Sequence, residues 1–333
     1  MVKVLSILKN NPNKNSSLCL LAPTRKNILI AARAINDAQL VAFPTETVYG
    51  LGGDATNDKA VAKIFSAKGR PKFNPLIIHL ISKSAAREIV HFCPRADKLA
   101  DAFWPGPLTL VLNRKPACKI SLLASAGLSS IAIRVPNNPL ALQLLEKAQT
   151  PVAAPSANLS GAVSPTNPEH VIASWANKTK MGPSIVLDGG PCRVGLESTV
   201  VDLTTKETII LRPGGITKTR IEREIGELKD LKKKNTDIKS PGMLAKHYAP
   251  RTPIIMNAKC AQPSGVFIGF GGGHREYQYN LSETANLEEA AANLFSFLHE
   301  VDKKYFSSIS IAPIPNQGLG VAINDRLSRA SKK

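Results

Sequence analysis

The chain has 333 residues, of which 43% are hydrophobic and 20% charged, and this globular composition excludes a wholly disordered protein. A chain of this length is expected to form two domains, each large enough to bury its own core. No apolar run approaches the roughly 18–20 residues that a membrane span needs, so no membrane association is expected. The formal net charge of +18 is concentrated in residues 1–150, which indicates an anionic partner, with a solvated basic surface as the equal alternative.

The five cysteines are an odd number, lie far apart in the sequence and include no CxxC pair. This pattern argues against a disulfide framework and against a zinc ribbon, and it favours free thiols in a reducing compartment. The first 15 residues have too short an apolar core for a secretory signal. We therefore expect a cytoplasmic protein.

Short strands alternate with helices up to residue 225, after a polar segment over residues 1–20 that we expect to be loose. Helices are expected where apolar residues recur at helical spacing: 24–38, 58–68, 95–103, 139–147 and 168–175. Strands are expected at short apolar or β-branched runs: 40–43, 76–81, 108–112, 131–135, 151–154, 185–187, 198–203 and 208–211. This interleaving predicts an α/β domain over residues 21–225, with a twisted mixed sheet and flanking helices.

The composition changes at residue 226, where a charged segment with few large apolar residues begins. Residues 226–252 are therefore predicted to be a linker between domains. Beyond it, strands are expected over 253–256, 265–270, 277–281 and 308–314, and amphipathic helices over 287–303 and 319–330. Residues 253–333 are thus predicted to form a small second α/β domain.

Polar and glycine residues follow the predicted strand over 40–43, in the segment PTETVYGLG at 44–52. Ligands of open α/β sheets bind where strands end in such glycine-rich loops. A capped turn without function explains this segment equally well.

Three cations lie within five residues, Lys68, Arg70 and Lys72, on a loop that Pro71 and Pro75 stiffen. Arginine grips two phosphate oxygens at once and lysine adds a point charge, so the loop predicts a polyphosphate site. It is not a Walker loop, because GxxxxGK[ST] is absent. A solvated basic turn is the alternative.

Two ionisable residues lie inside apolar strands. His79 is in the predicted strand over 76–81, where a histidine is more often a satisfied core residue than a ligand. Arg134 is stranger, because arginine is almost never buried without a partner. A central strand would require a carboxylate beside it, from Glu46, from Glu197 or from a ligand.

Three later segments also place hydroxyls, one cation or glycines next to a strand, at 153–161, 195–202 and 211–216. A turn or a cap explains each segment alone better than a ligand does. Together they indicate one ligand site, because no Ser-His-Asp set, zinc set or carboxylate pair competes for that role.

Six segments in a fixed order resemble the YrdC-like family: PTETVYGLG at 44–52, KGRPKFNPL at 68–76, GLSSIAIRVP at 127–136, APSANLSG at 154–161, ESTVVD at 197–202 and RPGGI at 212–216. The segments SPGMLAKHYAP at 240–250 and GLGVAINDRLSRA at 318–330 are similar to the two-domain form of that family. The resemblance covers residues 25–333 and implies a YrdC-like domain joined by a linker to a small Rossmann-like α/β domain.

The resemblance implies an activity, L-threonylcarbamoyladenylate synthesis from L-threonine, bicarbonate or CO2, and ATP, with release of pyrophosphate. The product would serve the threonylcarbamoyl modification of the tRNA adenosine next to the anticodon. Threonine-binding roles are implied for Thr47, His79, Arg134, Ala154 and Ser198. ATP-binding roles are implied for Lys68, Arg70, Asn74, Ser130, Ser156, Ser164, Arg212 and Tyr248, the last as part of a linker that closes over the nucleotide.

The chain departs from the family pattern at Ser129 and Ser130, where many members have an acidic residue and a threonine. Ser130 keeps a hydroxyl group at its position. The resemblance further implies a nucleotidyltransferase without a protein nucleophile, Mg²⁺ that arrives with ATP, and a downstream tRNA threonylcarbamoyl-transferase complex as partner. Weak direct binding of tRNA stays open.

Two rival functions have separate motivations. A nucleic-acid-binding module would explain the net charge of +18, but no RNA-recognition motif is present and only 5% of residues are aromatic. A YrdC-like carbamoyl-adenylate former of another pathway, such as hydrogenase maturation, would explain the motifs. The acylphosphatase and zinc-finger segments of that larger protein are missing here.

Overall fold

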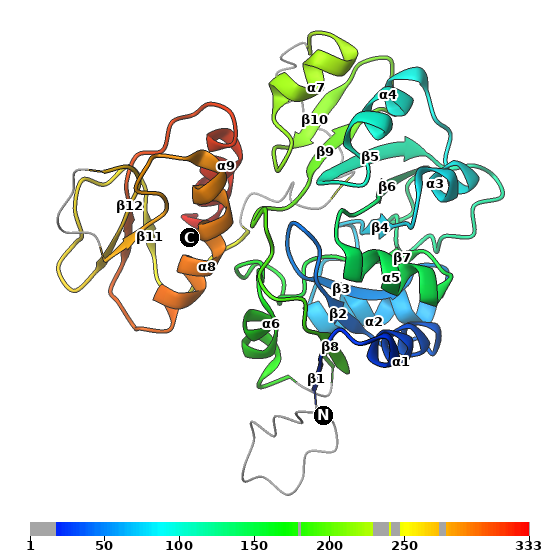
Figure 1. Cartoon of the computed structure of the whole chain (residues 1–333), viewed down its shortest axis with the longest axis horizontal. Coiled ribbons are helices and arrows are strands. Elements are labelled where there is room, and N and C mark those ends of the chain that lie inside the picture. The colour runs from blue at the N-terminus through cyan, green and yellow to red at the C-terminus, as the bar shows by residue number, and fades with distance from the viewer. Residues whose placement is uncertain (1–17, 179–180, 229–239, 241–246, 273–277, 333) are drawn as a thin grey trace, which may run out of the picture.

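The computed structural model describes residues 18–178, 181–228, 240, 247–272 and 278–332. A ten-stranded sheet and a four-stranded sheet divide the described chain. Figure 1 shows them as two lobes, which we call the first and the second domain. No helix within the described residues is long and apolar enough to cross a membrane.

The strands of the first domain are β1 (Cys19–Leu21), β2 (Val41–Phe43), β3 (Gly50–Asp54), β4 (Ile77–His79), β5 (Leu108–Asn113), β6 (Ser130–Arg134), β7 (Val152–Ala153), β8 (Ile185–Leu187), β9 (Thr199–Asp202) and β10 (Ile209–Arg212). Their order in the sheet is β1-β8-β2-β3-β7-β4-β6-β5-β9-β10. β4 pairs in parallel with β6, whereas β5 pairs antiparallel with β6, so the predicted mixed sheet is confirmed.

The helices described in this domain are α1 (Arg25–Asn36), α2 (Asp58–Lys68), α3 (Lys83–Ile89), α4 (Pro94–Phe103), α5 (Pro139–Ala148), α6 (Pro168–Trp175) and α7 (Lys218–Ile225). Local capping explains several starts. Thr24 accepts a hydrogen bond from the backbone N–H of Asn27 and caps α1. Asn138 and Asn167 cap α5 and α6, whose first residues are prolines.

Hydrophobic cores cover both faces of the ten-stranded sheet. α1 and α5 pack together over β2 and β8 on one face, and α2, α4 and α7 contribute to a larger core on the other. Because side chains alternate along a strand, His79 shares the face of α1 and α5, while its neighbour Ile78 lies in the larger core. The half of that face from β4 to β10 carries a small apolar cluster of Ile77, Val111, Ala132 and Val200, and the polar side chains of the site follow where these strands end.

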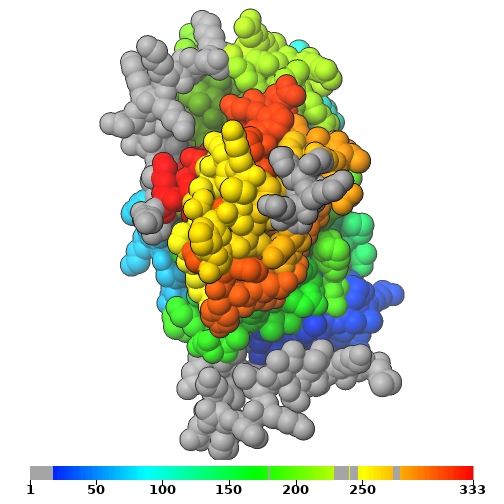
Figure 2. Space-filling model, turned by 90° about the vertical axis from the view of Figure 1, so that its left-hand side faces the viewer, coloured from blue at the N-terminus to red at the C-terminus, as the bar shows by residue number. Residues whose placement is uncertain are grey.

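The second domain contains the strands β11 (Ile254–Ile255), β12 (Val266–Gly269), β13 (Tyr279–Asn280) and β14 (Ile309–Ile311) and the helices α8 (Leu287–Asp302) and α9 (Gly320–Ala330). All its strand pairs are parallel, in the order β11-β14-β12-β13, as a small Rossmann-like unit requires. α8 and α9 lie between this sheet and the first domain (Figure 1). Figure 2 looks onto the second domain, with parts of the first visible around its rim.

The two domains share one apolar core. Val48 and Leu196 of the first domain pack in the same cluster as Phe295 of α8. Gly195 has a φ of +71°, and a Cβ there would lie 2.5 Å from the Cα atom of Ala292. Only glycine therefore lets this loop approach α8 so closely.

Four described elements were not predicted: β1, β3, α3 and α7. The segment 44–52 was expected to be a glycine-rich loop, but Gly50 begins β3, and Gly52 lies within that strand. A Cβ on Gly52 would lie 2.7 Å from the ring of Phe43, so this glycine makes room for an aromatic side chain.

The predicted ends of the first domain need two further corrections. Cys19 and Leu20 belong to β1, which pairs with β8, although a loose segment was expected over residues 1–20; residues 1–17 lie outside the described residues. Asp58 could have capped the helix expected over 58–68, but it is the first residue of α2, and Asn57 is the cap. Of the predicted linker, only residues 226–228, 240 and 247–252 are described.

Two histidines stack at the domain interface. The rings of His170 in α6 and His299 in α8 have centroids 3.9 Å apart. The Nε2 atom of His299 lies 3.1 Å from the backbone oxygen of Ser164 and donates to it. Burial lowers the pKa of His170 to about 3 and that of His299 to about 4, so both rings are neutral at pH 7.

We predict that this stack makes the folded protein sensitive to acid. A histidine whose pKa is lower in the folded than in the unfolded chain adds stability above its unfolded value of ~6.5, and this stability is lost as the pH falls. Chemical denaturation should give a lower free energy of unfolding at pH 5 than at pH 7, and each ring should contribute up to about 2 kcal/mol to the difference. His170→Gln with His299→Gln should reduce the loss, whereas a change at the exposed His91 should not; equal pH dependence in all variants would contradict the assignment.

Candidate active site

Three ionisable side chains end strands on the open half of the sheet face. His79, Arg134 and Arg212 are the last residues of β4, β6 and β10, and His79 is paired with Arg134 across the sheet. Together with Thr47 and Ser198 they line one cavity. The cavity thus lies at strand ends, where the sequence predicted a ligand site.

Arg134 forms a buried ion pair with Glu46, and each residue is only 3% exposed. The Nη2 atom of Arg134 lies 2.7 Å from Oε1 of Glu46, and Nη1 donates to Oγ1 of Thr47 at 2.9 Å. The structure thus selects Glu46 among the partners that the sequence left open. A guanidinium group has five N–H donors, so Arg134 keeps capacity for a second carboxylate in the cavity that it lines.

Arg212 is fixed by neutral oxygen atoms. Its Nε and Nη2 atoms donate to the backbone oxygen of Ser198 at 3.1 and 2.9 Å, and Nη2 lies 3.1 Å from Oγ of the same serine. The hydroxyl of Ser198 in turn lies 2.7 Å from that of Thr109. Arg212 is therefore rigidly held at the cavity wall.

The loop after α2 brings further cations to the cavity. Lys68 Nζ donates to the backbone oxygens of Ser156, at 2.6 Å, and of Asn158. Nη2 of Arg70 donates to Oδ1 of Asn74 at 2.6 Å. Burial, together with the charge of Arg70, lowers the pKa of Lys68 well below 10.5. Lys68 and Arg70 are buried and so are not part of a solvated basic turn, whereas Lys72, the third cation of the predicted loop, is exposed.

Glu197 joins the cavity to the second domain. Its Oε1 accepts a hydrogen bond from Oγ of Ser164 at 2.5 Å, and its Oε2 lies 2.7 Å from Nε of Arg326 in α9. Burial opposes the charge of Glu197, but Arg326, Arg212 and the hydrogen bond from Ser164 outweigh it and lower the pKa to about 2. Glu197 is therefore ionised at neutral pH.

Three buried cations at this cavity have no carboxylate within ion-pair distance among the described residues: Lys68, Arg70 and Arg212. Each is 7% exposed or less. Buried charges without an opposite charge are unfavourable, and arginine and lysine are rarely buried unless paired. The site therefore fits a ligand that carries several negative charges.

Unpaired polar atoms point to the same conclusion. In the described part of the chain, Nδ1 of His79, Nδ1 of His247 and Nδ2 of Asn74 are buried without a hydrogen-bond partner. Burial, with the charge of Arg134, lowers the pKa of His79 to about 3, so its ring is neutral. These atoms provide directional contacts for a polar ligand.

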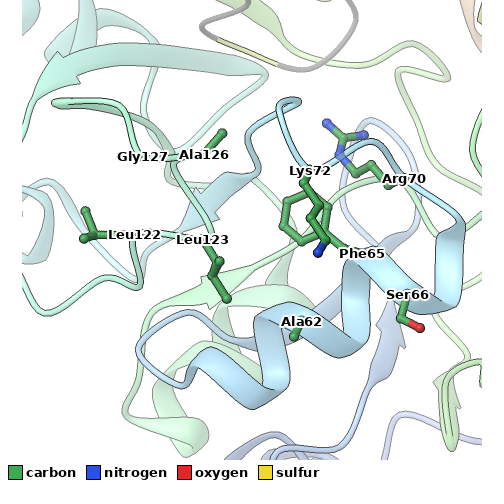
Figure 3. A pocket seen from close by; sticks show the side chains of 9 residues that line it. All are labelled: Ala62, Phe65, Ser66, Arg70, Lys72, Leu122, Leu123, Ala126 and Gly127. Carbon is green, nitrogen blue, oxygen red and sulfur yellow. The ribbon is translucent and has the colours of Figure 1, made fainter.

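A second hollow, of about 650 Å³, adjoins the site through Arg70. Figure 3 shows Leu122 and Leu123 of a loop on one side and Phe65 of α2 on the other, with Lys72 beside Phe65 and Arg70 beyond it. Apolar walls next to the buried Arg70 and the exposed Lys72 would suit a flat apolar group attached to phosphates.

The structure brings most of the residues that the resemblance singled out to one place. The threonine-group residues all line the cavity: Thr47, His79, Arg134, Ala154 and Ser198. So do four of the nucleotide group: Arg70, Ser156, Arg212 and Tyr248. Three others hydrogen-bond to lining residues: Lys68, Asn74 and Ser164. Ser130 lies apart, at the start of β6, four residues before Arg134.

Sequence reasoning missed Arg326 and Thr109. Arg326 has a signal in the sequence: it follows Ile323 by three residues, on the apolar face of the helix predicted over 319–330. A charge on an apolar face indicates a buried partner. Thr109 gives no such signal, because only the fold places it beside Ser198 of the cavity.

Known proteins share this architecture. A family model described as telomere recombination matches residues 33–214, and one described as threonylcarbamoyl-AMP synthase, C-terminal domain, matches residues 216–332. The chain belongs to the Sua5–YciO–YrdC family. A family relative from Pyrococcus abyssi named threonylcarbamoyl-AMP synthase is 40% identical over 326 residues, covering 91% of this chain and 94% of the relative.

Other members of the Sua5–YciO–YrdC family agree over the same length. A threonylcarbamoyl-AMP synthase from Bacillus subtilis is 40% identical over 322 residues, covering 90% of this chain and 92% of its own. The crystal structure of Sua5 from P. abyssi complexed with L-threonine matches with a TM-score of 0.84 and 38% identity, covering 95% of this chain and 98% of that one. The resemblance to a two-domain form of the family is thus confirmed.

We predict that Glu46→Gln destabilises the protein by about 3–5 kcal/mol, because it leaves the Arg134 charge buried without an anion. Urea denaturation measures the loss. Glu146→Gln is the matched control: it breaks the partly exposed pair with Lys147 and should cost less than about 1 kcal/mol. A similar small loss in both variants would show that the buried pair is unimportant.

Proposed function

We propose that this chain forms threonylcarbamoyl-AMP and pyrophosphate from L-threonine, bicarbonate or CO2, and ATP, and is therefore a nucleotidyltransferase. The observation that carries the proposal is the set of three buried cations without carboxylate partners, Lys68, Arg70 and Arg212, beside the paired Arg134. The family relatives of the same length and name support the same reaction.

The threonine would lie at the Arg134 end of the cavity. Arg134 would bind its carboxylate with the N–H groups that Glu46 and Thr47 leave free, because arginine suits planar carboxylates. The small side chain of Ala154 leaves space nearby, and the hydroxyl of Ser198 offers a hydrogen bond. The neutral ring of His79 contributes a further polar atom without adding charge.

The nucleotide phosphates would lie at the other end. Lys68, Arg70 and Arg212 would neutralise them, with Asn74 holding the guanidinium of Arg70 in place. The Ser156 and Ser164 hydroxyls, the ring of Tyr248 and, closer to the apolar hollow, Ser130 would contact the rest of the nucleotide.

The chemistry needs positioning and charge, without a protein nucleophile. The threonine amine adds to the carbon of CO2 and loses a proton, which gives a carbamate. A carbamate oxygen then attacks the α-phosphorus of ATP, and the bond to the β-phosphate oxygen breaks to release pyrophosphate. Lys68 and Arg70 would stabilise the negative charge that develops on the leaving group.

Mg²⁺ would enter as part of the nucleotide substrate. No group of three or more His, Cys, Asp or Glu residues in the described chain is arranged to hold a metal ion. The phosphates of ATP supply the oxygen ligands that Mg²⁺ prefers.

The product would pass to a tRNA threonylcarbamoyl-transferase complex. Weak contact with tRNA itself would use basic surface residues outside the cavity. We place this reaction in the cytoplasm, since no disulfide joins the five cysteines of the chain.

We predict that the purified protein releases pyrophosphate from MgATP only when L-threonine and bicarbonate are both present. Mass spectrometry of the reaction should detect threonylcarbamoyl-AMP. Serine is the competing substrate that the site should reject least well, because the one methyl group that it lacks provides only about 1–3 kcal/mol of discrimination in favour of threonine. Pyrophosphate release that does not depend on bicarbonate would contradict the proposal.

We further predict that two substitutions in the cavity affect different substrates, one mainly threonine and the other mainly MgATP. Arg134→Ala should raise the activation free energy of the threonine-dependent reaction by about 2–5 kcal/mol, because it removes the arginine that would bind the carboxylate of threonine. Lys68→Ala should weaken the binding of MgATP more than that of threonine. Calorimetry that finds equal losses of both ligands in both variants would refute the division of the cavity into two ends.

A further inference from the structure

Helix α9 of the second domain sends one charged side chain into the first domain. Arg326 is 1% exposed, and its Nε atom lies 2.7 Å from Oε2 of Glu197. Its Nη2 atom donates to the backbone oxygen of Pro213 at 3.0 Å. Its guanidinium carbon lies 5.1 Å from the centre of the Tyr248 ring. This one side chain therefore contacts Glu197 before β9, Pro213 after β10 and Tyr248 at the end of the linker.

Glu197 lies under the influence of two guanidinium groups. Arg326 provides its ion pair, whereas Arg212 contributes charge from a position where its own hydrogen bonds go to Ser198. Both Glu197 and Arg212 line the cavity. Without Arg326, the buried carboxylate would have Arg212 as its remaining source of positive charge on this side, and a buried carboxylate strongly favours pairing.

We propose that Arg326 is a positioning residue for the nucleotide: by holding Glu197 in an ion pair, it leaves Arg212 available to the phosphates. The proposal rests on the proposed function and adds a role for the second domain. Arg326 would act without touching the nucleotide, since its contacts go to Glu197, Pro213, Tyr248 and the neighbouring Asp325.

The contact with Tyr248 gives the same residue a second route to the site. The ring of Tyr248 contacts the guanidinium of Arg326 and also stacks with the ring of Phe295 in α8, whose centroid lies 5.6 Å from its own. A cation over an aromatic face stabilises that orientation of the ring. Both contacts come from the second domain, so its docking fixes the position of a cavity residue from the linker.

The test compares Arg326→Gln, Arg326→Lys, Glu197→Gln and the double variant Glu197→Gln with Arg326→Gln in the full chain. Arg251→Gln is the matched control, because Arg251 is an exposed cation at the end of the predicted linker whose ion pair is with Asp302 of α8. Threonine-dependent pyrophosphate release gives kcat and KM for each substrate, and calorimetry gives the affinity for MgATP. Thermal unfolding checks that each variant is folded.

Arg326→Gln should raise KM for ATP about tenfold or more and change KM for threonine much less. Arg326→Lys should recover part of the loss. The double variant should bind MgATP better than Arg326→Gln alone, because no carboxylate is left to pair with Arg212. This recovery is decisive when it appears in the affinity for MgATP and not in that for threonine. Relief of an unpaired buried charge would by itself restore thermal stability and change both affinities together.

Two results would overturn the proposal: equal losses for ATP and threonine, or a double variant that binds MgATP no better than Arg326→Gln. If Arg326→Gln does not fold, the affinities for MgATP and threonine are compared in Arg326→Lys, Glu197→Gln and the double variant, and these decide the role of Arg326. If the unmodified protein binds MgATP but makes no threonylcarbamoyl-AMP, the proposed function fails, and the calorimetric comparison still decides the role of Arg326.

Discussion

Buried positive charge needs negative charge close by, and the arrangement of this molecule follows from how that need is met. Arg134 obtains its anion from Glu46, and Arg326 obtains one from Glu197. Lys68, Arg70 and Arg212 are held by neutral oxygens only, among the described residues. The protein thus fixes cations in place at a cost in stability, in the way that binding sites for charged ligands commonly do.

The same need links the two domains. Apolar packing between α8 and the loops around Val48 and Leu196 docks them, but the ion pair between Arg326 and Glu197 gives the docking a fixed orientation. Because Glu197 also accepts a hydrogen bond from Ser164, the orientation of the second domain affects residues at the cavity. If the second domain undocked, Glu197 would lose its ion pair with Arg326, and the balance of charge in the cavity would change.

The sequence predicts the architecture well where local signals are strong. The helices predicted over 139–147 and 168–175 agree with α5 and α6 to within one residue, and apolar runs predict β5 and β8. It fails at β3, where glycines resemble a loop until the ring of Phe43 is seen to fill the space above them. Short helices such as α3 carry too few apolar residues to give a periodic signal.

The site divides in a similar way. Arg134 and the loop after α2 are visible as cations in unusual surroundings, so the sequence predicts an anion site there. The partner of Arg134 is not readable, because Glu46 and Glu197 are equally plausible until the strands are placed in register. Arg326 reaches the site across more than a hundred residues of sequence, a relation that only the docked domains reveal.

The most direct test of the central claim, that phosphates complete the charge of the cavity, is the proton balance of MgATP binding. Burial, with the charge of Arg70, lowers the pKa of Lys68, and bound phosphates would raise it. Binding of MgATP should therefore take up protons at pH values between the pKa of Lys68 in the free protein and its pKa in the complex. Calorimetric titrations in two buffers of different ionisation enthalpy measure this uptake. The account predicts net uptake that disappears in Lys68→Met; binding of MgATP with no uptake would contradict it.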